Sequence, residues 1–287
     1  MHRKKFFDPK IQKRPMRVAG FMSGSGTNII KIIENQIKYK KEGFTVIKSP
    51  TSSETIYEEM RITSPYEVVL LFSDKTDFIK CRISKISKQY GIPFEANDIR
   101  EFYSKRGYKD RRNMEVRKQY DHVTLEYLKK YEIDCVALCG YMSIVTNVIF
   151  DNFPTINVHP ADLSILNDKG ERKYTGEHAV RDAIYAGEKY IRSSTHLATA
   201  DVDGGPLLVI SVPVNVKLPS NITLENLKKE ENEEILNQIA DSHQDELKEI
   251  GDWIIFPKTL ELMAQGLIEK DEKNKIFINR NPAPLRL

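Results

Sequence analysis

The sequence has few of the residues that mark disulfide-stapled, metal-binding or membrane proteins. Its 287 residues include three cysteines and one tryptophan. An odd cysteine count without a CxxC pair gives neither a disulfide framework nor a zinc-site spacing. No window approaches the roughly 18 apolar residues that a membrane helix needs, and no apolar signal segment follows the basic start. These absences predict a cytoplasmic protein that folds on its hydrophobic core alone.

Neither sign of charge predominates in the sequence. The 44 basic and 41 acidic residues leave a net charge of +3, which makes no case for a nucleic-acid partner. The one markedly basic stretch is residues 1–15, MHRKKFFDPKIQKRP. We expect this segment to be a solvated leader, or a strap packed by Phe6 and Phe7, rather than a phosphate-binding arm.

Apolar runs alternate with amphipathic segments along most of the chain. The runs RVAGFM, EVVLLFSD, DCVALCG and TINVHP are typical of buried strands, and RSSTHLATAD with PLLVISVPV is typical of an antiparallel pair. This alternation predicts a Rossmann-like α/β fold, with a mostly parallel twisted sheet, helices on both faces and a late antiparallel strand pair. We expect a single domain over 16–287, with the turn-rich residues 43–66 inserted into it.

Helical periodicity is clearest in four segments. Ile29, Ile30, Ile33 and Ile37 form one stripe, and a helix over about 77–90 ends near Gly91. The segment NMEVRKQYDHVTLEYLKKY is expected to form a helix whose buried face carries Val116, Tyr120, Val123 and Leu128. Long polar helices are expected over roughly 222–266, followed by a late strand at KIFIN.

A glycine-rich loop, SGSGTN, follows the first predicted strand. It is no dinucleotide fingerprint, because Ile29 stands where GxGxxG needs its third glycine, and no GK[ST] follows to make a P-loop. Small residues that turn into a helix expose backbone N–H groups, and the helix dipole favours a phosphate there. A plain strand-to-helix turn capped by Thr27 or Asn28 fits the same residues.

Polar side chains gather at predicted strand ends. Asn157 and His159 lie two positions apart and project to the same side of a strand, and Asp203 precedes the permissive Gly204-Gly205 turn. The histidines His159, His178 and His196 have no metal-site spacing, so we predict no metal. No GxSxG elbow offers a nucleophile. An amide donor, a proton-handling group and a carboxylate together favour direct acyl transfer to an amine.

The segments SGSGTN, RKQYD, GYMSI, NVHPADL, GEHAVRDA and DVDGGP, in this order, closely resemble those of the folate-dependent glycinamide ribonucleotide formyltransferases. The resemblance runs over about residues 16–270. It implies an enzyme of purine biosynthesis that transfers a formyl group from 10-formyltetrahydrofolate, as cosubstrate, to the primary amine of glycinamide ribonucleotide. Its partners would be the phosphoribosyl amine and the folate, and neither a nucleic acid nor a membrane is implied. The resemblance is also compatible with a homodimer.

The resemblance also assigns roles to residues of this chain. Asn157 and His159 would stabilise the tetrahedral oxyanion, and Asp203 would support proton transfer to the leaving folate nitrogen, through water. The substrate phosphate would bind the loop Gly24, Ser25, Gly26, Thr27 and Asn28. The residues implied around substrate and folate are Arg117, Met142, Ile144, Val145, Asp201, Gly204 and Asp252.

Several features depart from the family pattern and leave the acceptor open. Ser143 stands where the family usually has an arginine, Asp252 replaces a glutamate, and the loop 161–176 is longer and more charged. Lys169, Arg172 or Lys173 in that loop is our hypothesis for the replacement cation. The residues 43–66 and the basic leader have no counterpart in short bacterial enzymes. The alternatives are another phosphorylated amine acceptor, a formyltetrahydrofolate hydrolase, and a non-catalytic module that binds a phosphate ligand.

Overall fold

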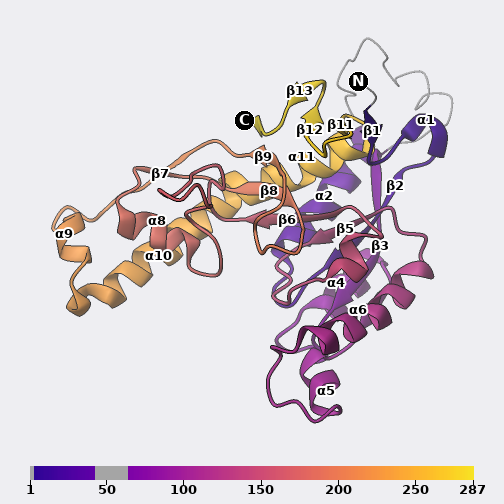
Figure 1. Cartoon of the computed structure of the whole chain (residues 1–287), viewed down its shortest axis with the longest axis horizontal. Helices are drawn as coiled ribbons and strands as arrows, with labels where there is room; N and C mark the ends of the chain where they lie inside the picture. Colours follow the sequence, from indigo (N-terminus) through magenta and orange to yellow (C-terminus); the bar gives the residue numbers. More distant parts are fainter. Residues whose placement is uncertain (1–2, 43–63) are drawn as a thin grey trace.

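A computed structural model describes residues 3–42 and 64–287, so nearly all of the expected insertion at 43–66 lies outside the described residues. The centre of the molecule is an eight-stranded sheet in the order β14-β9-β8-β6-β5-β2-β3-β4 (Figure 1). Its strands are β2 (Met16–Phe21), β3 (Tyr66–Ser73), β4 (Phe94–Ala96), β5 (Cys135–Leu138), β6 (Thr155–His159), β8 (Ser194–Leu197), β9 (Leu207–Ile210) and β14 (Leu285–Arg286).

The direction of the strands changes at one place in this sheet. From β4 to β6 all neighbours are parallel, whereas β8 runs antiparallel to both β6 and β9. The expected Rossmann-like sheet with a late antiparallel pair is therefore confirmed. The reversal also places the carboxyl end of β6 beside the start of β8, in a register that pairs Asn157 with His196.

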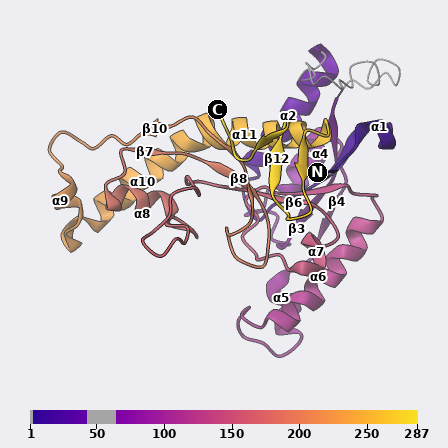
Figure 2. The same ribbon diagram turned by 45° about the horizontal axis from the view of Figure 1, so that its top comes forward.

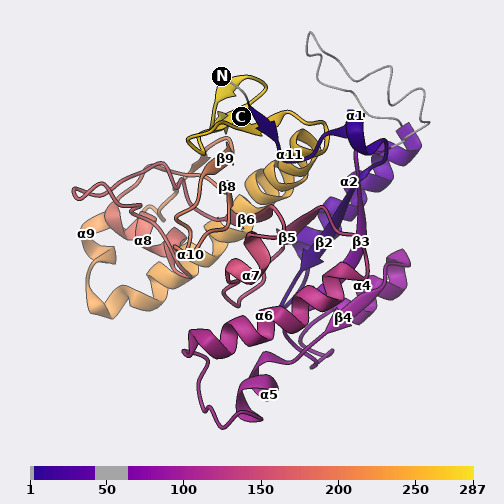
Figure 3. The ribbon, with the colours of Figure 1, turned by 45° about the vertical axis from the view of Figure 1, so that its right-hand side comes forward.

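Helices cover both faces of the sheet (Figure 3). One core contains side chains of α2 (Thr27–Glu42), α4 (Ile83–Tyr90) and α11 (Trp253–Ala264). The other core contains side chains of α5 (Ile99–Ser104), α6 (Met114–Lys129) and α7 (Asn147–Phe150). The sheet is thus buried on both sides, as the continuous apolar strands require. No helix of the described residues is long and apolar enough to span a bilayer.

A smaller arm extends from the antiparallel end of the sheet (Figure 1). It has its own apolar cluster, and its elements are β7 (Tyr190–Ile191), β10 (Val214–Asn215), α8 (Ala179–Ala186), α9 (Leu224–Leu227), η1 (Glu230–Asn232) and α10 (Glu233–Leu247). A π-helical turn, η2 (Lys248–Asp252), joins α10 to α11. The expected long helices over 222–266 are therefore interrupted, and the π turn sets the direction in which α11 enters the core.

The N-terminal segment is a packed strap. Its strand β1 (Lys4–Lys5) pairs with β11 (Ile268–Lys270), and the side chain of Phe7 is buried. Figure 2 shows this strap beside the end of the chain. The remaining elements here are α1 (Pro9–Gln12), β12 (Ile276–Ile278), which is the strand expected at KIFIN, and β13 (Asn281–Pro282).

Two helix predictions need correction. Val123 was expected on the buried face of α6, but 37% of its surface is exposed. Positions four apart stack on one face of a helix, so the series that begins at Val116 and Tyr120 continues to the buried Thr124. The helix expected from about 77 begins only at Ile83, because Asp77 accepts the backbone N–H groups that follow it and forms a turn.

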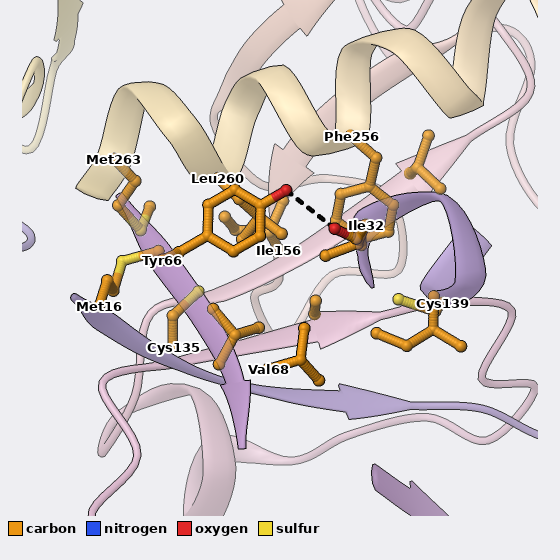
Figure 4. Close-up of a cluster of buried hydrophobic side chains, with 14 of the residues drawn as sticks. Met16, Ile32, Tyr66, Val68, Cys135, Cys139, Ile156, Phe256, Leu260 and Met263 are labelled. Carbon is orange, nitrogen blue, oxygen red and sulfur yellow. Dashed lines mark hydrogen bonds between the residues drawn. The ribbon is translucent and has the colours of Figure 1, made fainter. Parts of the chain in front are cut away.

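Tyr66 links the sheet to a helix inside the core (Figure 4). Its side chain is fully buried among apolar residues of the sheet and of α11. Its hydroxyl donates to the carbonyl oxygen of Ile32 at 3.1 Å and lies 2.8 Å from Oδ1 of Asn35. Both contacts are on α2, so one hydroxyl fixes the position of that helix over β3.

Replacing Tyr66 with phenylalanine should lower the free energy of unfolding by about 1–2 kcal/mol, because it leaves buried acceptors without their donor. Urea denaturation followed by circular dichroism measures the effect. Tyr190→Phe is the matched control, since the Tyr190 side chain is half exposed. Equal unfolding midpoints for the two variants would contradict the role of the Tyr66 hydroxyl.

Candidate active site

A cavity of about 440 Å³ opens at the carboxyl ends of the parallel strands β5 and β6. This edge is where open α/β sheets bind their ligands. Its walls include the segment 140–145 after β5, the end of β6, the 198–203 loop after β8, and Asn28 at the start of α2. Segments far apart in sequence therefore meet at one place, next to the strand reversal.

The structure brings together the three side chains predicted from the sequence. Asn157 and His159 lie two residues apart on β6 and so face the same side. Oδ1 of Asp203 lies 3.5 Å from Nδ2 of Asn157, and Oδ2 lies 3.4 Å from Nδ1 of His159. His159 and Asp203 are both buried, so the two charges that they can carry are little screened by water.

The backbone around Asp203 is held in an unusual conformation. Asp203 has φ 52°, in the left-handed region that non-glycine residues rarely adopt. A Cβ on Gly205 would lie 1.8 Å from the carbonyl oxygen of Leu197, so only glycine fits there. The guanidinium of Arg172 donates to the carbonyl oxygens of Asp203 and Gly205. Arg172 therefore holds this loop in place. This role differs from the one we expected for it from the sequence, which was to bind a carboxylate of the incoming folate.

His159 and Asp203 hold different protonation states at neutral pH. Burial lowers the pKa of His159, against the opposing effect of Asp203. Burial acts to raise the pKa of Asp203. The hydrogen bond with His196, the positive charge that His159 carries at acid pH and the N–H of Gly176, 3.0 Å from Oδ2, outweigh it and bring that pKa to about 2. Asp203 is consequently ionised beside a neutral imidazole.

The hydrogen bonds of His159 define its tautomer. Nε2 lies 3.1 Å from the carbonyl oxygen of Tyr174, which can only accept, so Nε2 carries the proton. The other nitrogen, Nδ1, then has a lone pair directed at the ionised Asp203. A proton that arrives at Nδ1 would be stabilised by this carboxylate, so the pair forms a site that can take up one proton.

His196 belongs to the same group, although its position in the sequence did not indicate this role. Its Nδ1 lies 3.0 Å from the carbonyl oxygen of Leu197, and its Nε2 lies 3.2 Å from Nδ2 of Asn157 and 3.5 Å from Oδ1 of Asp203. It therefore orients the Asn157 amide. The antiparallel pairing of β6 and β8 places the two side chains opposite each other. A prediction of that strand pairing from the sequence would have identified His196 as a neighbour of Asn157. Within residues 3–42 and 64–287, no cluster of metal-binding side chains occurs.

The glycine-rich loop has the free donors that a phosphate needs. In the described chain, no acceptor contacts the backbone N–H groups of Gly24 to Asn28, and α2 begins at Thr27. Gly26 has φ 69°, and a Cβ there would lie within 2.7 Å of Ile86 and Met22. The loop thus packs tightly while its N–H groups, at the positive end of the helix dipole, remain available.

Asp252 lies at the end of the π turn, and such turns often occur at functional sites. Its carboxylate is buried, lines the cavity and accepts a 2.5 Å hydrogen bond from Oγ of Ser193. Burial raises its pKa to about 6, against hydrogen bonds from Ser193 and Asn28 that lower it. Asp252 is therefore mostly ionised at neutral pH and faces the same space as the Asn28 end of the loop.

The predicted folate segment forms an apolar wall of the cavity. Met142 is 61% exposed and Ile144 is 50% exposed, which is unusual for such side chains, and Val145 and Asp201 line the cavity beside them. Two predicted residues lie elsewhere. Gly204 follows Asp203 in its turn and is not among the residues that line the cavity, and Arg117 lines a neighbouring cavity that shares residues 142–144. Ser143 donates to the buried Asp74.

Comparisons with known proteins agree with this architecture. A family model described as formyl transferase matches residues 16–239. The chain is 31% identical over 101 residues to phosphoribosylglycinamide formyltransferase of Escherichia coli, an alignment that covers 34% of this chain and 44% of that protein. It is 28% identical over 143 residues to formyltetrahydrofolate deformylase of a Synechocystis strain, which covers 50% of this chain and 41% of that protein. The chain thus spans less than half the length of both curated relatives.

One solved structure shares the fold over nearly the whole chain. It is the phosphoribosylglycinamide formyltransferase of Coxiella burnetii, with a TM-score of 0.61, 20% identity, and coverage of 96% of this chain and 100% of that one. At this identity the likeness concerns the fold alone. The family model, in contrast, covers well over half of the sequence. The chain therefore belongs to the formyl transferase family.

Proposed function

We propose that this enzyme transfers the formyl group of 10-formyltetrahydrofolate to the primary amine of glycinamide ribonucleotide. The observation that carries the proposal is the composition of one cavity. Asn157, His159 and Asp203 line the same cavity as the apolar wall at Met142 and as Asn28 at the end of the glycine-rich loop. An aromatic pterin suits the wall, a phosphate suits the loop, and the reacting atoms would meet at the polar trio.

Asn157 and His159 would act on the charge that develops during the reaction. When the amine attacks the formyl carbon, the formyl oxygen becomes an oxyanion, and an N–H group of Asn157 can donate to it. The Asn157 contact to Asp203 is 3.5 Å long, so this donor can be redirected to the substrate. Long hydrogen bonds in an empty site commonly tighten when the reacting complex forms.

His159 and Asp203 would handle the proton. The attacking nitrogen must lose a proton, and the neutral Nδ1 of His159 can accept it. The ionised Asp203 stabilises the resulting imidazolium, whose positive charge also stabilises the nearby oxyanion. As the bond between the formyl carbon and folate N10 breaks, the same proton passes to N10, directly or through a water, and the amide product is released with no net proton uptake at the histidine.

Two alternative reactions would use the same residues, Asn157, His159 and Asp203. Water in place of the amine would make the protein a hydrolase, as the name of the Synechocystis relative denotes. A different phosphorylated amine would use the same loop. The N–H groups of Gly24 to Asn28, which have no partner among the described residues, and the carboxylate of Asp252 favour an acceptor that carries both a phosphate and an amine.

Formation of tetrahydrofolate from 10-formyltetrahydrofolate, followed by absorbance, separates these readings. We expect formation that depends on glycinamide ribonucleotide. Formation at the same rate without any acceptor would establish the hydrolase instead. Formation only with another phosphorylated amine would retain the transfer chemistry and change the acceptor.

Asp203→Asn should reduce kcat by about 10²- to 10⁴-fold, because the imidazolium of His159 loses its stabilising charge. The affinity for the phosphate-bearing acceptor, measured by calorimetry, should stay unchanged, since the glycine-rich loop is untouched. Asp151→Asn, at an exposed carboxylate that directly follows α7 and does not line the cavity, is the matched control and should retain full activity. A fully active Asp203→Asn enzyme would contradict the proposed role.

Asp252→Asn should raise the acceptor KM about ten- to a hundred-fold at pH 8, where the wild-type carboxylate is ionised and forms a charge-assisted bond to the amine. The pKa of Asp252 is raised to about 6, so wild-type protein loses this charge as the pH falls through 6. The ratio of variant to wild-type KM should therefore fall towards one at pH 5. A ratio that stays constant from pH 5 to 8 would show that Asp252 does not contact the amine.

A further inference from the structure

Three neighbouring strands, β5, β2 and β3, are parallel and therefore end at the same edge of the sheet (Figure 3). The chain after β2 forms the glycine-rich loop, which begins at Gly24, and the chain after β5 forms the apolar wall around Met142. The residue directly after β3 is Asp74, whose side chain is 1% exposed. Asp74 is not among the residues that line the active-site cavity, so the chemistry proposed above gives it no role.

The carboxylate of Asp74 accepts a hydrogen bond from each of these two segments. Its Oδ1 accepts from Oγ of Ser23 at 2.6 Å, and its Oδ2 accepts from Oγ of Ser143. Oγ of Ser23 also accepts the backbone N–H of Met142 at 2.9 Å, so its one hydrogen is directed at Asp74. The N–H of Ser23 donates to the carbonyl oxygen of Gly140 at 3.1 Å. One buried carboxylate thus links the start of the glycine-rich loop to the apolar wall.

Hydrogen bonds alone offset the burial of this carboxyl group. Among residues 3–42 and 64–287, no ion pair includes Asp74. Burial of a polar group is unfavourable unless it is hydrogen-bonded, and an apolar side chain of similar volume would fill the same space at less cost. The two hydroxyl contacts are therefore what distinguishes Asp74 from a residue that only packs.

Ser143 makes this link particular to the present chain. It stands where the family usually has an arginine, and its single hydroxyl hydrogen is donated to Asp74. That hydrogen is consequently not available to an incoming ligand. The serine joins the apolar wall to the end of β3, which an arginine directed at a ligand would not do.

We propose that Asp74 is a positioning residue, which fixes the separation of the glycine-rich loop and the apolar wall through Ser23 and Ser143. The inference rests on the proposed function, which assigns the phosphate of the acceptor to the loop and the pterin of the donor to the wall. Transfer between two bound substrates needs the reacting atoms about 3–3.5 Å apart, and a displacement of about 1 Å can lower the rate on the order of 100-fold. Because each segment holds one substrate, the link between the segments sets this distance.

Asp74→Ala should lower kcat roughly ten- to a hundred-fold, whereas the KM of each substrate changes by a smaller factor, because each binding segment keeps its own ligand contacts. Asp74→Asn should recover most of kcat, since its amide can accept from Ser23 and donate to Ser143. Steady-state kinetics with both substrates varied give these constants. A loss confined to the KM of the donor, with kcat unchanged, would show a local packing role and overturn the proposal.

Ser143→Ala breaks one side of the link at a residue that is only partly buried, so this variant serves if Asp74→Ala does not fold. It should lower kcat in the same direction by a smaller factor, and adding it to Asp74→Ala should cause little further loss, because the two changes break the same link. Additive losses would contradict the link. The matched control is Asp134→Ala, at a hydrogen-bonded carboxylate that precedes the opposite end of β5, and it should keep the wild-type kcat.

Hydrogen exchange followed by mass spectrometry separates this inference from the proposed function, since it needs no substrate. Peptides that cover residues 22–28 and 139–145 should exchange faster in Asp74→Ala than in wild-type protein, and at the wild-type rate in Asp134→Ala. Faster exchange in both segments would support the link even if glycinamide ribonucleotide proved not to be the acceptor. Transfer to glycinamide ribonucleotide with an unchanged kcat in Asp74→Ala would support the proposed function and refute the link, as would unchanged exchange in both segments.

Discussion

The carboxylate of Asp203 contacts groups from three separate parts of the chain, and the site takes its shape from these contacts. It lies beside Asn157 and His159 of β6, beside His196 of β8, and accepts the N–H of Gly176 from the long loop. Without an ionised group here, two buried imidazoles and an amide would face one another with unmatched donors and acceptors. One charge therefore organises both the polar network and the path of the loops around it.

The sheet makes this convergence possible. Strands β5 and β6 end at the same edge because they are parallel, and the antiparallel β8 returns from that edge. Its cross-strand register places His196 opposite Asn157, and the 198–205 turn then brings Asp203 back over both. The long loop 161–176 completes the enclosure, with the carbonyl of Tyr174 on His159 and the guanidinium of Arg172 on the turn. The residues of this longer loop thus contribute contacts inside the site.

Much of this could be predicted from local sequence. Period-two alternation put Asn157 and His159 on one side of a strand, and alternating apolar runs gave the fold class. Features that depend on how distant segments pack against one another could not be predicted from local sequence patterns. The role of His196 needs the register between β6 and β8, the exposure of Val123 needs the actual rotation of α6, and the clamp by Arg172 needs a loop whose path no periodicity encodes. The strap at Phe7 was one of two open alternatives, because burial of a short basic segment depends on what lies beneath it.

The π turn at residues 248–252 also limits the insertions and deletions that this part of the chain can tolerate. A π turn holds one residue more than the α-helical turn it replaces, so it resets the angular phase between α10 and α11. Because an α-helix rotates by about 100° per residue, the apolar face of α11 and the direction of Asp252 are both fixed by that single additional residue. The core and the cavity are therefore coupled by the angular phase of the helix. A one-residue deletion here could not both keep Phe256 buried in the core and keep the carboxylate of Asp252 in the cavity.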